Sequence, residues 1–139
     1  SVAYADSADN ANNLGGQPAG AFASQASEPY REVGTPGNPG FQNGWQNVGG
    51  ATSTVAFYKD SLGIVHLRGN LVSGINGETA FTLPAGYRPP KSLFMPAATS
   101  GLSDSAAVEL FANGNANVSF GGSGAPIIGL AGLSFRADS

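Results

Sequence analysis

The sequence predicts an all-β protein: an antiparallel β-sandwich of jelly-roll type built from about eight short strands. Gly (21) and Pro (9) make up more than a fifth of the 139 residues, and both disfavour helix interiors. Short runs in which apolar and polar residues alternate have the period of half-buried strands. Turn-forming residues separate these runs at a spacing of about ten residues. Together these features favour a sandwich over an open sheet.

The first segment, 1–27, differs from the remainder because it consists mainly of Ala, Asn, Asp, Ser and Gly. A single copy buries too little apolar surface to offset the entropy lost on ordering, so alone it is expected to be disordered. Two interpretations stay open, a flexible linker and the end of a fibre shaft. Its sizeable apolar residues are few: Val2, Tyr4, Leu14 and Phe22.

Segment 28–44 is rich in Pro and Gly and is predicted to be a neck between 1–27 and a head at 45–139. Its residues 35–40, TPGNPG, can form two consecutive Pro-led turns. The large apolar residues Phe41 and Trp45 are expected to pin the neck onto the head. Its charged residues are interpreted as a solvated group: Glu28, Arg31 and Glu32.

The head is divided into strands by its alternation and its turns. Segment 64–73 is expected to be the longest strand, with Val65, Leu67 and Leu71 on the inner face. Asn76-Gly77 is the strongest hairpin signal, and a second turn is expected at residues 113–114. In residues 80–83, Phe81 and Leu83 are expected to share one face, and Ala80 and Thr82 the other. The predicted strands are 45–48, 52–59, 64–73, 80–83, 91–99, 106–112, 117–120 and about 127–136.

Residues 84–90, PAGYRPP, are predicted to form a rigid corner, because two consecutive prolines fix φ and extend the backbone before them. We expect Tyr87 to lie against the head with its hydroxyl group hydrogen-bonded. Arg88 is expected to bond a nearby backbone carbonyl or carboxylate.

Several predicted strands are apolar on both faces: residues 93–95, 108–111 and 127–133. One face of each can fill the core between two sheets, whereas the second face needs another cover. Association of three copies would provide that cover, particularly because few charges would need desolvation. Burial of both faces within a single chain is the alternative.

Composition excludes several classes of function. Charged residues make up 11% of the chain and the net charge is −3, which argues against nucleic-acid binding. Without cysteine there is no disulfide or thiolate chemistry. No run approaches the roughly 18 apolar residues of a membrane span, and no basic-then-apolar signal peptide opens the chain. The chain begins at Ser1 without Met, so an origin as part of a longer protein stays open.

No catalytic or metal site is predicted, and no cofactor. His66 is the only histidine, so one chain cannot form a multi-histidine metal site. A serine triad would have to use this histidine, and the G-x-S-x-G motif is absent. The glycines at 121–124 lack the lysine of a phosphate-binding loop. A glycosidase needs two carboxyl groups within about 5–10 Å, and the candidates lie on separate elements: Asp60, Glu78, Asp104 and Glu109.

The residues 83–89, LPAGYRP, resemble the C-terminal head domains of bacteriophage tail-fibre and baseplate receptor-binding proteins, or of fibres from phage-tail-like contractile injection systems. This resemblance extends from Trp45 to the C-terminus and implies a trimeric head of jelly-roll type. The order of residues from Ala5 to Ala19, followed by Phe22 and Ala23, is similar to the ADxLGGxPAxxFA units of phage fibre shafts. An extended, fibre-like N-terminal segment is therefore expected before the head.

The resemblance implies a homotrimeric tail-fibre tip, on a virion tail or an extracellular injection particle, that binds a host surface glycan or other envelope component. An upstream fibre or baseplate protein is the implied partner. A purely structural trimerising cap and a glycan depolymerase fragment are the alternatives. No ligand site is assigned, since each candidate also fits a structural role: the aromatic residues Trp45, Tyr58 and Tyr87, and the loop residues Asn76, Asn113 and Asn115.

Overall fold

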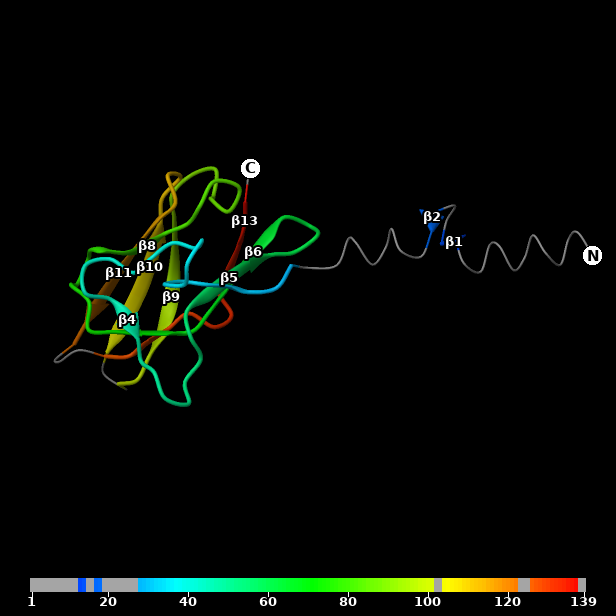
Figure 1. The fold of residues 1–139 in the computed structure, drawn as a ribbon. Helices are drawn as coiled ribbons and strands as arrows, with labels where there is room; N and C mark the ends of the chain where they lie inside the picture. The colour runs from blue at the N-terminus through cyan, green and yellow to red at the C-terminus, as the bar shows by residue number, and fades with distance from the viewer. Residues whose placement is uncertain (1–12, 15–16, 19–27, 102–103, 123–125, 138–139) are drawn as a thin grey trace, which may run out of the picture.

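The computed structural model describes residues 13–14, 17–18, 28–101, 104–122 and 126–137, and this part of the chain is all-β without a helix (Figure 1). It therefore contains no helix long and apolar enough to cross a membrane. The short strands β1 (Asn13–Leu14) and β2 (Gln17–Pro18) pair with each other. The fibre-like character predicted for 1–27 otherwise lies outside the described residues.

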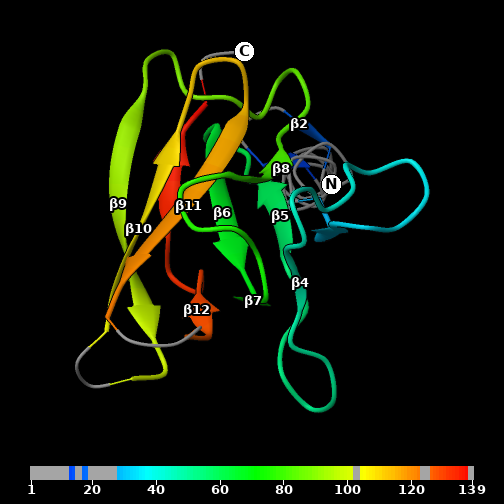
Figure 2. The ribbon, with the colours of Figure 1, turned by 90° about the vertical axis from the view of Figure 1, so that its left-hand side faces the viewer.

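Two antiparallel sheets follow, and both contain strands from distant parts of the sequence. The seven-stranded sheet has the order β4-β7-β12-β9-β10-β11-β8, and the four-stranded sheet has the order β13-β6-β5-β3. Figure 2 shows β9, β10 and β11 side by side, with β5 and β6 in the other layer. The strands are β3 (Arg31–Glu32), β4 (Gln46–Asn47), β5 (Ala56–Lys59), β6 (Ile64–Arg68), β7 (Asn70–Val72), β8 (Thr79–Thr82), β9 (Leu93–Thr99), β10 (Ser105–Leu110), β11 (Asn115–Gly121), β12 (Ile128–Gly129) and β13 (Ser134–Arg136).

The core lies between the sheets, where apolar side chains from both are withdrawn from water. The predicted inner face of Val65, Leu67 and Leu71 is confirmed, because all three are at most 2% exposed. The largest fully buried side chains are Phe57, Phe81, Leu71, Leu83, Leu110, Ile128, Leu130, Val55, Val65, Val108 and Val118.

The predicted continuous strand 64–73 is wrong, because Gly69 divides it between the two sheets. Gly69 has a φ of 104°, and a Cβ atom there would lie 2.4 Å from the carbonyl oxygen of Thr54. Only glycine fits this close approach, which lets β6 end in one sheet and β7 begin in the other. The predicted strand 127–136 is divided in the same way, into β12 and β13. These divisions, together with β3, raise the strand number above the expected eight.

The predicted hairpin at Asn76-Gly77 forms its turn but not its strand pairing. The backbone N–H of Glu78 donates to the carbonyl of Ile75 at 3.1 Å, and Gly77 has positive φ. However, β7 pairs with β4 and β12, whereas β8 pairs with β11. The turn at 113–114 does connect a hairpin, that of β10 and β11. Local turn chemistry therefore predicted both bends but only one of the pairings.

The predicted alternation in β8 is also interrupted. Ala80 and Phe81 are both buried although they are consecutive, because the register with β11 shifts between Ala116 and Asn117. Such a bulge places two neighbouring residues on one side of the sheet.

Segment 28–44, the predicted neck, contributes to the two-sheet fold. Its strand β3 pairs with β5, and Val33, which follows, is 3% exposed within the core. The division into 1–27, 28–44 and 45–139 stays a prediction.

The corner at 84–90 has the contacts expected of it. The backbone N–H of Tyr87 donates to the carbonyl of Pro84 at 3.1 Å, which closes a turn. The Arg88 Nε–H donates to the carbonyl of Leu83 at 2.8 Å, as predicted. The corner is thus held by hydrogen bonds as well as by its prolines.

Candidate functional site

A hollow of about 520 Å³ lies beside β3, and we call it the Glu32 hollow. Its walls come from β3 and the turn after it, from β4, and from the residue before Val55. A volume of this size is within the range of small-molecule sites, about 300–1,000 Å³. The lining residues are Glu32, Val33, Gly34, Thr35, Phe41, Gln46, Asn47 and Thr54.

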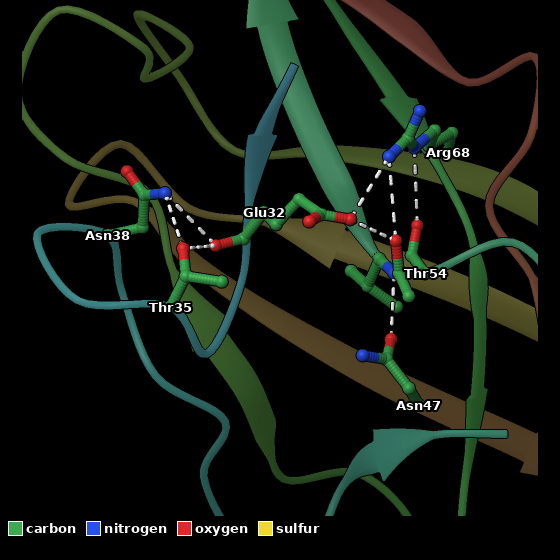
Figure 3. Close-up of polar contacts among 7 residues, drawn as sticks. Glu32, Thr35, Asn38, Asn47, Thr54 and Arg68 are labelled. Carbon is green, nitrogen blue, oxygen red and sulfur yellow. Dashed lines mark hydrogen bonds and ion pairs between the residues drawn. The ribbon is translucent and has the colours of Figure 1, made fainter. Parts of the chain in front are cut away.

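The turn after β3 is fixed by side-chain hydrogen bonds to the backbone of Glu32 (Figure 3). The Thr35 hydroxyl donates to the Glu32 carbonyl at 2.8 Å. The Asn38 amide donates to that carbonyl at 3.1 Å and to the Thr35 hydroxyl oxygen at 2.9 Å. Since Gly34 has a φ of 95°, the chain can reverse there without strain. This wall of the hollow is therefore preorganised.

The side chain of Glu32 extends to the opposite side, where it meets β6 and the residues before β5 (Figure 3). Its Oε1 atom accepts hydrogen bonds from the Thr54 hydroxyl and from Arg68 Nη2, the latter at 3.2 Å. Nearby, Asn47 Oδ1 accepts the backbone N–H of Val55 at 2.7 Å. The side chains of Arg68 and Glu32 are 34% and 43% exposed. The ion pair is therefore open to water and contributes little stability.

The apolar part of the hollow is formed by Val33 and Phe41. Val33 is buried, and Phe41 is half-buried and packs against the core. A Cβ atom at position 34 would lie 3.4 Å from the Phe41 ring. Glycine at this position therefore leaves that part of the ring free of a side-chain contact. The hollow thus combines an aromatic surface with polar walls.

A row of aromatic and charged side chains begins at Arg68. The Arg68 guanidinium lies 4.2 Å from the centre of the Tyr30 ring, and Tyr30 meets Tyr58 edge-on at 4.7 Å. Tyr58 stacks on His66, with ring centres 4.8 Å apart. His66 Nε2 is 2.8 Å from Asp60 Oδ2. This hydrogen bond, followed by that from the Ile64 backbone N–H, lowers the pKa of Asp60.

None of the three predicted aromatic candidates lines the hollow. Trp45 is 3% exposed and meets Phe120 edge-on, and its Nε1 has no hydrogen-bond partner among the described residues. Tyr58 packs between Tyr30 and His66. Tyr87 is half-buried against Phe57, at 5.2 Å between ring centres. Each of the three packs against other side chains of the fold.

The predicted asparagines bond the protein itself. The Asn76 side chain donates to the carbonyl of Phe120 and accepts its N–H, at 2.7 and 2.8 Å. Asn113 Oδ1 accepts the N–H of Asn115, and Asn115 Oδ1 accepts the Thr82 hydroxyl. These residues shape turns and strand contacts, and the structure does not bring them together into one site.

Tyr87 and Glu28 form a second polar cluster, at the corner. The Tyr87 hydroxyl donates to the Glu28 carboxylate at 2.6 Å. Burial, followed by this hydrogen bond, raises the pKa of Tyr87. Burial also raises the pKa of Glu28, but hydrogen bonds from Tyr87, Arg31 and the Lys59 backbone outweigh that effect, and the pKa is lowered overall. The predicted bonding of the Tyr87 hydroxyl is confirmed.

The sequence did not reveal the Glu32 hollow. The prediction for Glu32 is a solvated charge, and its side chain is 43% exposed, but it also bonds Thr54 and Arg68, which are 22 and 36 residues away in the chain. No local pattern encodes such contacts. Residues 30–33, YREV, do not alternate between apolar and polar, so the period-two signal of a strand is absent here.

Within the described ranges, no group of three or more His, Asp or Glu side chains is placed to hold a metal ion. The hollow can instead hold a polar ligand against the Phe41 ring, with hydrogen bonds to its walls.

No protein-family model matches the chain, and the comparison with curated proteins finds no match. Among solved structures, the fold is similar to that of the receptor binding protein (gp15) of Listeria phage PSA. The TM-score is 0.69 at 20% sequence identity, and the match covers 99% of this chain and 77% of that chain. At this identity the match shows a shared fold.

Proposed function

We propose that this chain is a receptor-binding tip of a phage tail or of a tail-like injection particle, and that it binds a host surface glycan through a jelly-roll head. The observation that carries this proposal is the fold shared along 99% of the chain with a phage receptor binding protein. The Glu32 hollow, which is open to water and has polar and aromatic walls, is the candidate contact with the receptor. An upstream fibre or baseplate protein would hold the tip on the particle.

The proposed tip is a homotrimer. Phe94 on β9 is 73% exposed, and its neighbours on the same face, Pro96 and Ala98, are also exposed. One chain leaves this apolar face uncovered, which is unfavourable unless another surface buries it. Light scattering at micromolar concentration should give three times 13.9 kDa. A stable, folded monomer would contradict the trimer.

Receptor binding is tested by incubating the purified protein with candidate host cells and their isolated surface polysaccharides. We expect adhesion to the cells and retention on the polysaccharide, without shortening of its chains. Absence of both adhesion and retention would favour a structural cap. Release of oligosaccharides would instead identify a depolymerase fragment.

A further inference from the structure

In the part of the chain that the structure describes, three side chains of the Glu32 hollow keep polar atoms without a hydrogen-bond partner: Glu32, Asn47 and the exposed Gln46. Glu32 bonds Thr54 and Arg68 through Oε1, which leaves Oε2 as an acceptor. Asn47 accepts the Val55 N–H through Oδ1, which identifies the other amide atom as the NH2 donor. In Figure 3 the Asn47 nitrogen points away from the Val55 contact, to the side on which Thr35 lies.

The two hydroxyl groups of the walls are already engaged. The Thr35 hydroxyl donates to the Glu32 carbonyl and accepts from Asn38. The Thr54 hydroxyl donates to Glu32 and accepts from Arg68. A ligand in the hollow therefore meets the Glu32 carboxylate as an acceptor, the Asn47 NH2 group as a donor and the exposed Gln46 amide, with Phe41 also in the lining.

An acceptor and a donor in one hollow suit the hydroxyl groups of a sugar, which can donate to Glu32 and accept from Asn47. A phosphate group at neutral pH carries acceptor oxygens and a charge of about −1.5 to −2, so Glu32 repels it. An ammonium group can donate to Glu32 but cannot accept from Asn47. The half-buried Phe41 ring offers an apolar surface for the C–H groups of a sugar.

We propose that the Glu32 hollow binds a hydroxyl-bearing, uncharged sugar unit and discriminates against phosphate-bearing units of a cell-surface polymer. This inference rests on the proposed receptor-binding function and specifies the chemistry of its ligand. Arg68 bonds Oε1 and so already fixes the orientation of the Glu32 carboxylate. The side chain therefore loses little conformational entropy when a ligand binds to Oε2.

Two isosteric substitutions separate the proposed contacts from the fold. Glu32→Gln keeps an oxygen for Thr54 and Arg68 but replaces the Oε2 acceptor by a donor. Asn47→Asp keeps the acceptor for the Val55 N–H but removes the donor and adds a charge. Glu109→Gln makes the same change of glutamate to glutamine on β10, in the seven-stranded sheet and outside the hollow, and serves as the matched control.

The probes are methyl glucoside, methyl galactoside, N-acetylglucosamine and glycerol phosphate, titrated into the isotope-labelled full chain and followed by NMR. We expect at least one of the three uncharged sugars to shift the backbone amides of Gly34 and Asn47, and glycerol phosphate to leave them in place. Glu32→Gln should weaken binding of this sugar at least about tenfold, as expected for loss of a hydrogen bond to a charged group. Asn47→Asp loses a neutral hydrogen bond and should weaken binding about two- to tenfold. The melting temperature and the binding of the Glu109→Gln control should match the wild type.

The inference is overturned if no sugar shifts these amides, if glycerol phosphate shifts them as strongly, or if Glu32→Gln binds the sugar like the wild type. Adhesion to host cells, measured on the same preparations, tests the proposed function separately. Adhesion of both hollow variants at wild-type level would place the receptor contact elsewhere and leave the receptor role intact. Failure of the wild type to adhere while a sugar still shifts the two amides would contradict the receptor role alone.

Discussion

Replacing Tyr87 by alanine should destabilise the fold, because this side chain joins the corner at 84–90 to Glu28, before β3, and to Phe57 on β5. Its ring meets Phe57 at 5.2 Å with an angle of 75° between the planes. Its hydroxyl donates to both oxygens of Glu28, at 2.6 and 2.8 Å. The Lys59 ammonium group lies over the Tyr87 ring, 5.2 Å from the ring centre.

The magnitude follows from these contacts. An edge-on aromatic pair contributes about 0.5–1.5 kcal/mol beyond burial of its area. A hydrogen bond to a charged group contributes about 1.5–3 kcal/mol, and here less, because the Glu28 side chain is 24% exposed. We expect Tyr87→Ala to lower the free energy of unfolding by about 3 kcal/mol per chain. Tyr87→Phe keeps the ring and should cost about 1 kcal/mol.

The assay is thermal and denaturant unfolding of the wild type and both variants at equal protein concentration, which matters for an associating protein. For a chain of this length, about 3 kcal/mol corresponds to a fall of roughly ten degrees in the melting temperature. Cell adhesion is measured in parallel. Loss of adhesion by Tyr87→Ala with an unchanged melting curve would refute the structural role and make Tyr87 a ligand-binding residue.

Further substitutions test other parts of the fold. Gly74→Ala should destabilise strongly, since the added Cβ would lie 1.8 Å from the Trp45 ring, and chemical denaturation checks this. Phe94→Glu should prevent association and give a folded monomer in light scattering, whereas an unchanged trimer would place the interface elsewhere. The pKa of Asp60 is lowered in the fold, so its contact with His66 stabilises the protein fully at pH values above the ordinary carboxyl pKa of about 3.9. This stabilisation is lost as the pH falls through the lowered pKa. In Asp60→Asn, stability should therefore decline less between pH 5 and pH 2, and equal slopes would contradict the pKa shift.

Features that depend on neighbouring residues were predictable from the sequence. The period-two pattern of Val65 and Leu67, the turns at 76–77 and 113–114, and the proline-fixed corner are encoded within a few residues of one another. The corner contact of Arg88 was predictable for the same reason, since its partner is five residues away.

Features that depend on distant parts of the chain were not predictable in this way. Gly69 ends β6 because the backbone of Thr54 lies close to it. This contact joins residues 15 positions apart, and no local sequence pattern predicts it. The Glu32 hollow combines the turn after β3, β4 and the residues before β5, which only the sheet pairing brings together. The aromatic candidates did not indicate the hollow, because none of them lines it and Trp45 is buried in the core.

The contacts of Glu28 determine how a pulling force along the chain would enter the fold. Tension applied just before residue 28 would reach the two large sheets through this residue, ahead of the two-residue strand β3. The Glu28 carboxylate is bonded to Arg31, to the Lys59 backbone and to Tyr87, and so distributes the load over β3, β5 and the corner. The attachment would weaken mechanically in acid as the carboxylate becomes protonated, so a tip anchored here would detach from its sheets at lower force.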